Sequence, residues 1–424
     1  MRRLIAAALL LALSLPPSGQ AEESSGHAPA AETHEAAPEG HEPSAEGHKA
    51  TEAEAPDEAA PQPAPGPSPT EIALAQELDA LFLLQDATAR GRQDAAALQK
   101  PLLLRLRDQF NAAPLAEAER LSLLVAAYVL SGGDPATAER MAKEGKLSGM
   151  RKRLLEGVAL FMRGDRPAAA KLLLPLDTSR LPARLAGRVA LAQALLEREP
   201  EARQQRLSWA AAAMPGTLVE ESALRRSALG YAETAEQKHF WKRLTRYQRR
   251  FPDSLYARAF WEEAMDKILA WSSEGKAPQL DRLDLVLAEL PVARRRALYL
   301  HLARQSAAGA HVPLTEYAAR RVVRLAVPGS QEDQLGRLYL ALYSIASETG
   351  EAARAGLASI SPALLTPRER ALREAGLAIA GQITRPAEAG GAEASEAVPE
   401  QSPLEQRGET LLQQAAKLIA ESSS

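Results

Sequence analysis

Apolar residues recur every three to four positions throughout the middle of the chain. In residues 181–200 they are Leu181, Leu185, Val189, Ala192 and Leu196, and the same spacing returns in residues 280–290 and 335–345. This spacing places apolar side chains on one face of an α-helix. β-Branched and aromatic residues that alternate with polar ones, as half-buried strands require, are scarce beside alanine and leucine. We therefore predict that residues 71–384, called the body below, are all-α.

The predicted helices are separated by residues that end one helix and begin the next. Gly132 and Gly133 can end a helix, Asp134 can cap the following one, and Pro135 suits its first turn. A related turn at residues 164–167 follows Gly133 after 31 residues, the spacing of a tetratricopeptide-like helix pair. Thr366-Pro367-Arg368-Glu369 has the pattern of a capping box. The body is therefore expected to be an irregular, tetratricopeptide-like solenoid of helix pairs.

The two ends of the chain differ from the body in composition. Residues 1–21 combine two arginines, a short apolar run and small residues, which is the pattern of a secretory signal peptide cleaved after Ala21. Residues 22–70 are mostly Ala, Glu, Pro, Gly and His and are expected to be disordered, because they cannot bury enough apolar surface. Residues 385–403 resemble a linker. Residues 404–424 predict a short amphipathic helix that either folds back on the body or docks on a partner.

The absence of cysteine limits what an exported chain of this kind can be. It excludes disulfides, thiolate catalysis, cysteine-ligated metal sites and a lipoprotein anchor. After the signal peptide no apolar stretch is long enough to span a bilayer, so the mature protein is expected to be soluble and not membrane-embedded. The periplasm is the simplest location for such a protein.

Charge is divided unevenly along the chain. The formal net charge is −3, but residues 1–21 carry +2, residues 22–70 carry −10 and the end from Arg385 carries −4, which leaves the body at +9. A basic body between acidic ends favours either an acidic partner or shielding of the body by its own ends. Nucleic acid is not expected as a partner, because an exported protein leaves the cytoplasm.

Four histidines in the acidic tail are spaced seven residues apart: His27, His34, His41 and His48. Imidazole is a common metal ligand, so the tail could bind metal weakly. The alternative is an expanded repeat without a function, and the spacing alone leaves both open. Nearby prolines prevent this spacing from forming one helical face.

Motifs of enzymatic chemistry are missing from the sequence. It contains no serine-hydrolase elbow, no His-Glu-x-x-His, no phosphate loop and no glycine-rich dinucleotide turn. In the body only His239, His301 and His311 supply imidazoles, and their spacing matches no metal-ligand pattern. We therefore predict a protein that is not an enzyme and has neither a cofactor nor a metal site.

The most unusual segment is residues 231–271, which hold nine of the eighteen aromatic residues. On the helix predicted within it, Trp241 lies on an apolar side with Leu244 and Phe251, and three arginines share another side: Arg243, Arg246 and Arg250. Arginine beside aromatic residues is favoured in protein-binding hot spots, so Trp241 and these arginines are the candidate partner-binding residues. The alternative is a well-packed helix pair whose arginines are only hydrated.

Several segments resemble the MotC family of periplasmic flagellar-motor proteins. They are residues 83–86 (Leu-Leu-Gln-Asp), 91–94 (Gly-Arg-Gln-Asp), 128–137 (Tyr-Val-Leu-Ser-Gly-Gly-Asp-Pro-Ala-Thr) and 246–254 (Arg-Tyr-Gln-Arg-Arg-Phe-Pro-Asp-Ser). The resemblance covers about residues 75–380. It implies a role in chemotactic motility and flagellar rotation, with the periplasmic part of the stator protein MotB as the partner. It supplies no catalytic residue.

Two other functions are compatible with an exported helical protein. One is a general tetratricopeptide-like scaffold for assembly of the cell envelope. The other is the helical arm of a lytic transglycosylase, which would need a compact catalytic domain after the helices. Only 39 residues follow Arg385, most of them in a linker, so the transglycosylase interpretation is disfavoured.

Overall fold

The computed structural model describes residues 66–276, 278–347 and 350–383, and they contain α-helices and 3-10 helices but no strand. The prediction of an all-α fold is therefore confirmed. The chain divides after Ile72, within the first of the described helices, and the unit that begins at Ala73 contains the other described helices. The expected signal peptide, acidic tail, linker and C-terminal helix lie outside the described residues.

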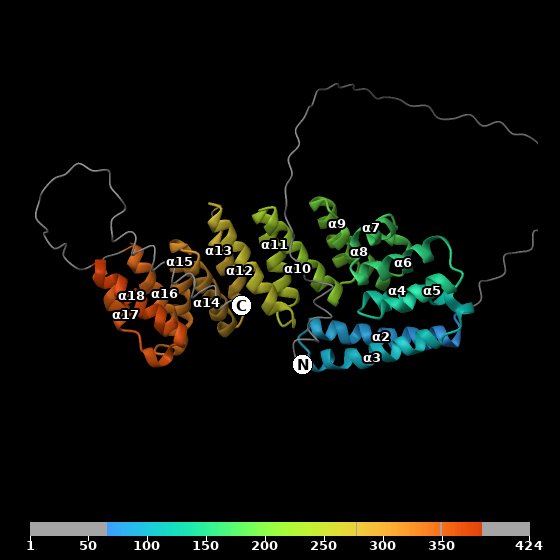
Figure 1. The fold of residues 1–424 in the computed structure, drawn as a ribbon, viewed down its shortest axis with the longest axis horizontal. Coiled ribbons are helices and arrows are strands. Elements are labelled where there is room, and N and C mark those ends of the chain that lie inside the picture. Colours follow the sequence, from blue (N-terminus) through green and yellow to red (C-terminus); the bar gives the residue numbers. More distant parts are fainter. Residues whose placement is uncertain (1–65, 277, 348–349, 384–424) are drawn as a thin grey trace, which may run out of the picture. The chain divides into compact units, whose positions relative to one another are not determined.

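The described α-helices follow one another with short connections (Figure 1). Their bounds are α2 Pro69–Ala89, α3 Gln93–Ala112, α4 Ala118–Leu130, α5 Pro135–Glu144, α6 Gly149–Arg163, α7 Arg166–Leu173, α8 Ala183–Leu196, α9 Pro200–Ala213, α10 Leu218–Glu233, α11 Gln237–Arg250, α12 Ala257–Ser273, α13 Leu280–Ala288, α14 Val292–Ala308, α15 Val312–Leu325, α16 Gln331–Ser347, α17 Gly350–Ala358 and α18 Pro367–Ile383. Three 3-10 helices are η1 Leu115–Glu117, η2 Thr178–Arg180 and η3 Pro362–Leu364.

The predicted helix boundaries are confirmed where capping residues mark them. The Asp134 side chain accepts a hydrogen bond from the Ala136 N–H at 2.9 Å, and Pro135 is the first residue of α5. In the Thr366 capping box, the Glu369 N–H donates to Thr366 Oγ1 at 3.4 Å and Glu369 Oε2 accepts from the Thr366 N–H at 2.9 Å. These bonds satisfy backbone groups that have no partner within the helix, so the boundaries are set locally.

Alternate helices in the second half of the chain form a continuous row. α10 contacts α12, α12 contacts α14, α14 contacts α16, and α16 contacts α18. The intervening helices pack between members of this row, α15 beside α14 and α16, and α17 beside α16 and α18. This succession of helix pairs is the arrangement of a helical repeat protein.

The α2–α3 hairpin departs from the pattern in which each helix pair contacts only its neighbours. Gln85 of α2 donates to the backbone carbonyl of Ser131 at 2.8 Å. The guanidinium of Arg188 in α8 lies 3.6 Å from the centre of the Phe82 ring and also donates to Ser131 Oγ at 3.0 Å. α2 therefore joins the end of α4 and the start of α8, which are far apart in the sequence (Figure 1).

Candidate functional site

The aromatic side of α11 belongs to the core. Trp241 is 1% exposed and Leu244 is fully buried, and the Trp241 ring packs edge-on against Phe240 with centroids 5.0 Å apart. Tyr247 packs on Phe260 of α12 at 4.3 Å between ring centroids. The predicted sidedness of the helix is correct, but Trp241 offers no surface to a partner. Trp241 instead packs α11 against the hydrophobic core.

The other side of α11 carries the three predicted arginines, which we call the arginine face: Arg243, Arg246 and Arg250. Arg243 donates to Ser208 Oγ of α9 at 2.8 Å. Arg246 and Arg250 both donate to Glu220 of α10, at 2.8 Å and 2.6 Å, while their side chains stay 47% and 43% exposed. The arginine face is therefore open to solvent and at the same time fixed by contacts beneath it.

Glu220 is the residue that organises this face. It is fully buried, and besides the two arginines it accepts a hydrogen bond from the Gly216 N–H at 2.7 Å. Burial alone would raise the pKa of Glu220, but the hydrogen bonds from Arg250, the Gly216 N–H and Arg246 outweigh burial and hold this pKa below its usual value. The carboxylate stays charged and keeps both guanidinium groups in one orientation.

The next residue, Glu221, is also fully buried and faces a different set of partners. It accepts from Tyr247 Oη at 2.9 Å, from Ser254 Oγ at 3.1 Å and from Arg225 Nε at 3.1 Å. Burial and the neighbouring Glu221 carboxylate raise the pKa of Tyr247, so its hydroxyl remains a donor. Two adjacent carboxylates thus attach the start of α10 to α11 and the α11–α12 connection.

Sequence reasoning singled out the arginines but missed Glu220. A signal was present, because Thr217-Leu218-Val219-Glu220 has the capping-box pattern. Thr217 does cap α10, but the Glu220 side chain bonds the Gly216 N–H and the α11 arginines. Nothing in the local pattern indicates partners that lie 26 and 30 residues later in the chain.

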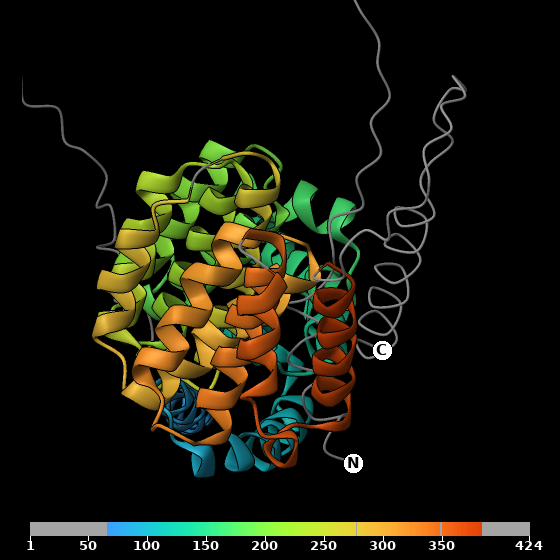
Figure 2. The same ribbon diagram turned by 90° about the vertical axis from the view of Figure 1, so that its left-hand side faces the viewer.

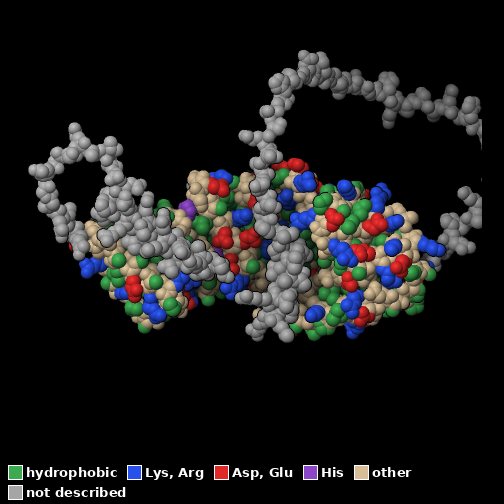
Figure 3. Space-filling model, viewed as in Figure 1, with side chains coloured by type: hydrophobic (Ala, Val, Ile, Leu, Met, Phe, Trp, Pro, Cys, Tyr) green, Lys and Arg blue, Asp and Glu red, His purple; other side chains and the backbone are tan. Residues whose placement is uncertain are grey.

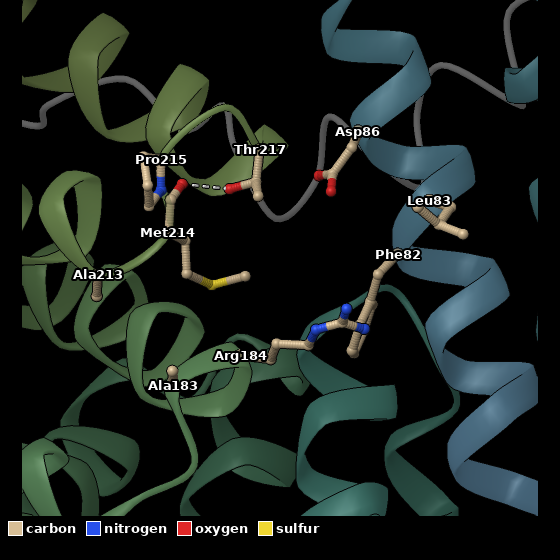
Figure 4. A pocket seen from close by; sticks show the side chains of 9 residues that line it. All are labelled: Phe82, Leu83, Asp86, Ala183, Arg184, Ala213, Met214, Pro215 and Thr217. Carbon is tan, nitrogen blue, oxygen red and sulfur yellow. Dashed lines mark hydrogen bonds between the residues drawn. The ribbon is translucent and has the colours of Figure 1, made fainter.

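A pocket of about 190 Å³ lies beside the start of α10, between α2, the start of α8 and the α9–α10 connection (Figure 4). It is mostly apolar, and Leu83 at its edge is 64% exposed. The lining residues are Phe82, Leu83, Asp86, Ala183, Arg184, Ala213, Met214, Pro215 and Thr217. Thr217 lines this pocket and Glu220 follows three residues later in the chain. The pocket therefore lies close to Glu220, the buried residue that holds Arg246 and Arg250.

Asp86 is the acidic residue of the pocket. Its carboxylate accepts a hydrogen bond from the Leu218 N–H at 2.8 Å, so α2 helps to cap α10 from a distant part of the chain. Burial raises the pKa of Asp86, although the Leu218 N–H and the nearby Arg188, Arg90 and Arg184 act in the opposite direction. The pocket therefore combines a mostly apolar lining with one acidic side chain, Asp86, and one basic side chain, Arg184.

The positive charge of the body does not by itself mark a site. On the face shown in Figure 3, Lys and Arg side chains are interspersed with Asp and Glu over the described helices. The arginine face stands out by its contacts, because two of its members converge on one buried carboxylate.

The histidines of the body lie apart from this site. His239 Nδ1 is 3.0 Å from Glu236, His301 Nε2 is 3.0 Å from Asp266, and His311 Nε2 is 3.1 Å from Ser273 Oγ. In the described part of the chain no three His, Cys, Asp or Glu residues are placed to hold a metal ion. The tail histidines at positions 27, 34, 41 and 48 lie outside it.

Comparison with known proteins extends over most of the chain. The family model described as chemotaxis protein MotC matches residues 2–423. A protein named chemotaxis protein MotC from Rhizobium meliloti (strain 1021) is 28% identical over 315 residues, which cover 72% of this chain and 71% of that protein. No solved structure matches the chain.

Within the described helices, none has the length and apolar character needed to cross a bilayer.

Proposed function

Because this chain belongs to the MotC family of chemotaxis proteins, we propose that it is a non-enzymatic component of the flagellar motor. The match confirms the resemblance first seen in segments such as residues 128–137, and a role in chemotaxis or motility follows from it. The finer proposal is that the protein binds the periplasmic part of the stator protein MotB and thereby supports rotation. The family is one of motility accessory proteins.

We place the protein in the periplasm. The support is the pattern of residues 1–21, with two arginines, a short apolar run and cleavage expected after Ala21. The cysteine-free composition also fits a chain that folds after export without disulfides. Fractionation of cells, with mass spectrometry of the mature N-terminus, tests this assignment directly.

The observation that carries the binding proposal is the arginine face with its buried support. Arg246 and Arg250 are held by Glu220, so they lose little side-chain freedom when a partner docks. The neighbouring apolar pocket supplies a place for a partner's apolar side chain. A surface of this kind suits an acidic segment with an apolar anchor, and we propose that MotB presents such a segment.

Arg243→Glu is the variant that tests the surface most cleanly. Arg243 bonds the Ser208 hydroxyl, whereas Arg246 and Arg250 also support Glu220. The matched control is Arg180→Glu, which makes the same charge change at a side chain that is 83% exposed in η2. Isothermal titration of the mature protein with the periplasmic part of MotB should show about tenfold weaker binding for Arg243→Glu, about 1.4 kcal/mol, and little change for the control.

If Arg243→Glu binds MotB as tightly as the control Arg180→Glu does, the arginine face is only hydrated and does not contact MotB. If the mature protein does not bind MotB at all, the general periplasmic scaffold becomes the better function. A pull-down from periplasm would then be needed to find the partner.

A further inference from the structure

α3 carries apolar side chains on the side that faces away from the core. Its inner side includes Leu106, which is fully buried. On its outer side Leu98 is 56% exposed and Leu104 is 43% exposed, and Ala97 and Pro101 beside them are exposed as well. α3 lies at the lower margin of the described helices in Figure 1 and in Figure 2. Single exposed leucines are normal, but these four apolar residues lie within about two turns of one helix, and we call them the α3 apolar face.

Charged residues border the α3 apolar face at both ends. Arg92 and Asp94 come before it, and Arg105 and Asp108 come after it. The four side chains are well exposed, between 61% and 68%. From one end of the face to the other, the order is therefore cation, anion, apolar residues, cation, anion.

The ion pairs that these four charged residues make within the chain lie at the surface. Arg92 bonds Asp94, two residues away, at 2.6 Å. Arg105 bonds Glu77 of α2 at 3.0 Å, and Asp108 pairs with the residue before it in the sequence. Exposed pairs of this kind contribute little to stability, because water solvates the separated charges nearly as well. The four groups can therefore exchange these partners for charges on another molecule.

A second copy of α3 that runs antiparallel presents the same order in reverse. Arg92 then lies opposite Asp108 of the partner subunit, and Asp94 lies opposite Arg105 of the partner subunit. Both pairs are centred at residues 99–100 of α3, so one register satisfies the two at once. Asp94 and Arg105 are eleven residues apart, close to three helical turns, so they lie along the same edge of α3. A two-fold axis places that edge opposite the same edge of the second copy.

The same register brings apolar residues together between the charged ends. Leu98 lies opposite Pro101 of the partner subunit, and Leu104 lies close to Ala97 of the partner subunit. Lys100 is near the two-fold axis, but it lies on the edge of α3 away from the ion pairs. Solvent at that edge screens the like charges of the two copies.

We propose that two copies of this protein associate through the α3 apolar face as an antiparallel, two-fold symmetric helix pair. The occupant is a second copy, because the order of charges along α3 complements itself, which a partner of unrelated sequence would not require. From Arg92 to Asp108 the contact extends over roughly 24 Å of helix. The arginine face lies on α11 and takes no part in this contact, so the proposal does not rest on the proposed function.

Sedimentation velocity of the full mature chain tests the proposal. The protein should sediment as a dimer at micromolar concentration. Leu104→Asp should raise the Kd of the dimer about tenfold or more, because it places a charge in the apolar part of the contact. The matched control is Leu285→Asp, the same change at a side chain of α13 that is 71% exposed, and it should leave the Kd unchanged.

Two outcomes of this experiment would overturn the proposal. One is a wild-type protein that remains monomeric up to about 100 µM. The other is a dimer whose Kd does not change in Leu104→Asp, because its contact would then lie elsewhere on the molecule.

An exchange of charges separates a contact between copies from a role within the fold. Arg105→Asp or Asp94→Arg alone places like charges opposite each other and should raise the Kd about tenfold. The double variant restores opposite charges and should return the Kd to within about threefold of the wild type, although the bond from residue 105 to Glu77 is still missing. If the double variant dimerises as weakly as the single variants, Asp94 and Arg105 do not face each other and the antiparallel register is wrong.

The second charge pair provides the same test if Arg105→Asp fails to fold. Arg92→Asp and Asp108→Arg should each weaken the dimer, and together they should restore it. Circular dichroism of every variant confirms that the helices are intact. Failure of both double variants to recover the dimer would overturn the α3 contact, whereas the affinity for MotB is a separate measurement.

Discussion

Arg250 donates a hydrogen bond at 2.6 Å to the fully buried carboxylate of Glu220, and the two residues lie on adjacent helices, α11 and α10. Arg246 donates to the other oxygen of the same carboxylate. The outer parts of both guanidinium groups remain in solvent. One set of side chains therefore serves both as a support for the fold and as a surface that a partner can contact.

Arg250→Ala should lower the free energy of unfolding by about 1–3 kcal/mol, because it removes a donor from a buried carboxylate. The partial exposure of Arg250 places the effect below that of a fully buried ion pair. Urea denaturation followed by circular dichroism measures the change. Arg243→Ala, which removes a bond to a serine hydroxyl, should cost less. The pair does not support the fold if Arg250→Ala leaves the free energy of unfolding unchanged both in the wild type and in the Glu220→Gln variant.

Trp241→Ala should destabilise the protein by about 3–5 kcal/mol, because it leaves a large cavity in the core. The matched control is Trp209→Ala in α9, where the side chain is 39% exposed and the cost should be much smaller. Thermal unfolding of the two variants separates the cases. A stable Trp241→Ala protein that has lost only partner binding would show that Trp241 is a contact residue after all.

Acid should weaken the attachment of α10 to α11. The folded-state pKa of Glu220 lies below its unfolded value, so its contribution to stability is present above the unfolded pKa and is lost as pH falls through the folded pKa. Urea midpoints measured between neutral pH and about pH 3 should therefore converge for the wild type and Glu220→Gln as the carboxylate is protonated. A difference between the two proteins that stays constant with pH would contradict the charged state assigned to Glu220.

Binding through the arginine face should weaken as salt increases. Screening shortens the range of charge interactions to about 8 Å at physiological ionic strength and to about 3 Å at 1 M. The affinity of the wild type for the MotB periplasmic part should fall across this range, and the fall should be smaller for Arg243→Ala. An affinity that does not depend on salt would assign the contact to the apolar pocket instead.

How much could be predicted from the sequence depends on whether the determining contact is local. The boundaries at Asp134 and Thr366 were predictable, because their capping bonds join residues within one turn. The helical side shared by Trp241 and Leu244 was predicted from their spacing. The burial of Trp241 was not, because apolar spacing gives the side of a helix and not what covers it, and the assignment of Trp241 to a partner surface was therefore wrong.

The contacts that build the candidate site are not local. Glu220 meets arginines from the following helix, and Asp86 caps a helix that begins 132 residues later. Arg188 stacks on Phe82 across a similar separation. The last two pairs depend on where α2 lies against α8 and α10, and no spacing rule of a helical repeat places it there.

Swimming by a strain that lacks the gene tests most directly whether this MotC-family protein supports rotation of the flagellar motor. Swimming rings in soft agar should shrink in the deletion strain, while electron microscopy shows flagella in normal number. The wild-type gene supplied in trans should restore the rings, whereas the Arg243→Glu gene should restore them only in part at equal protein levels. Rings of normal size in the deletion strain would contradict a role in rotation and favour a general periplasmic scaffold.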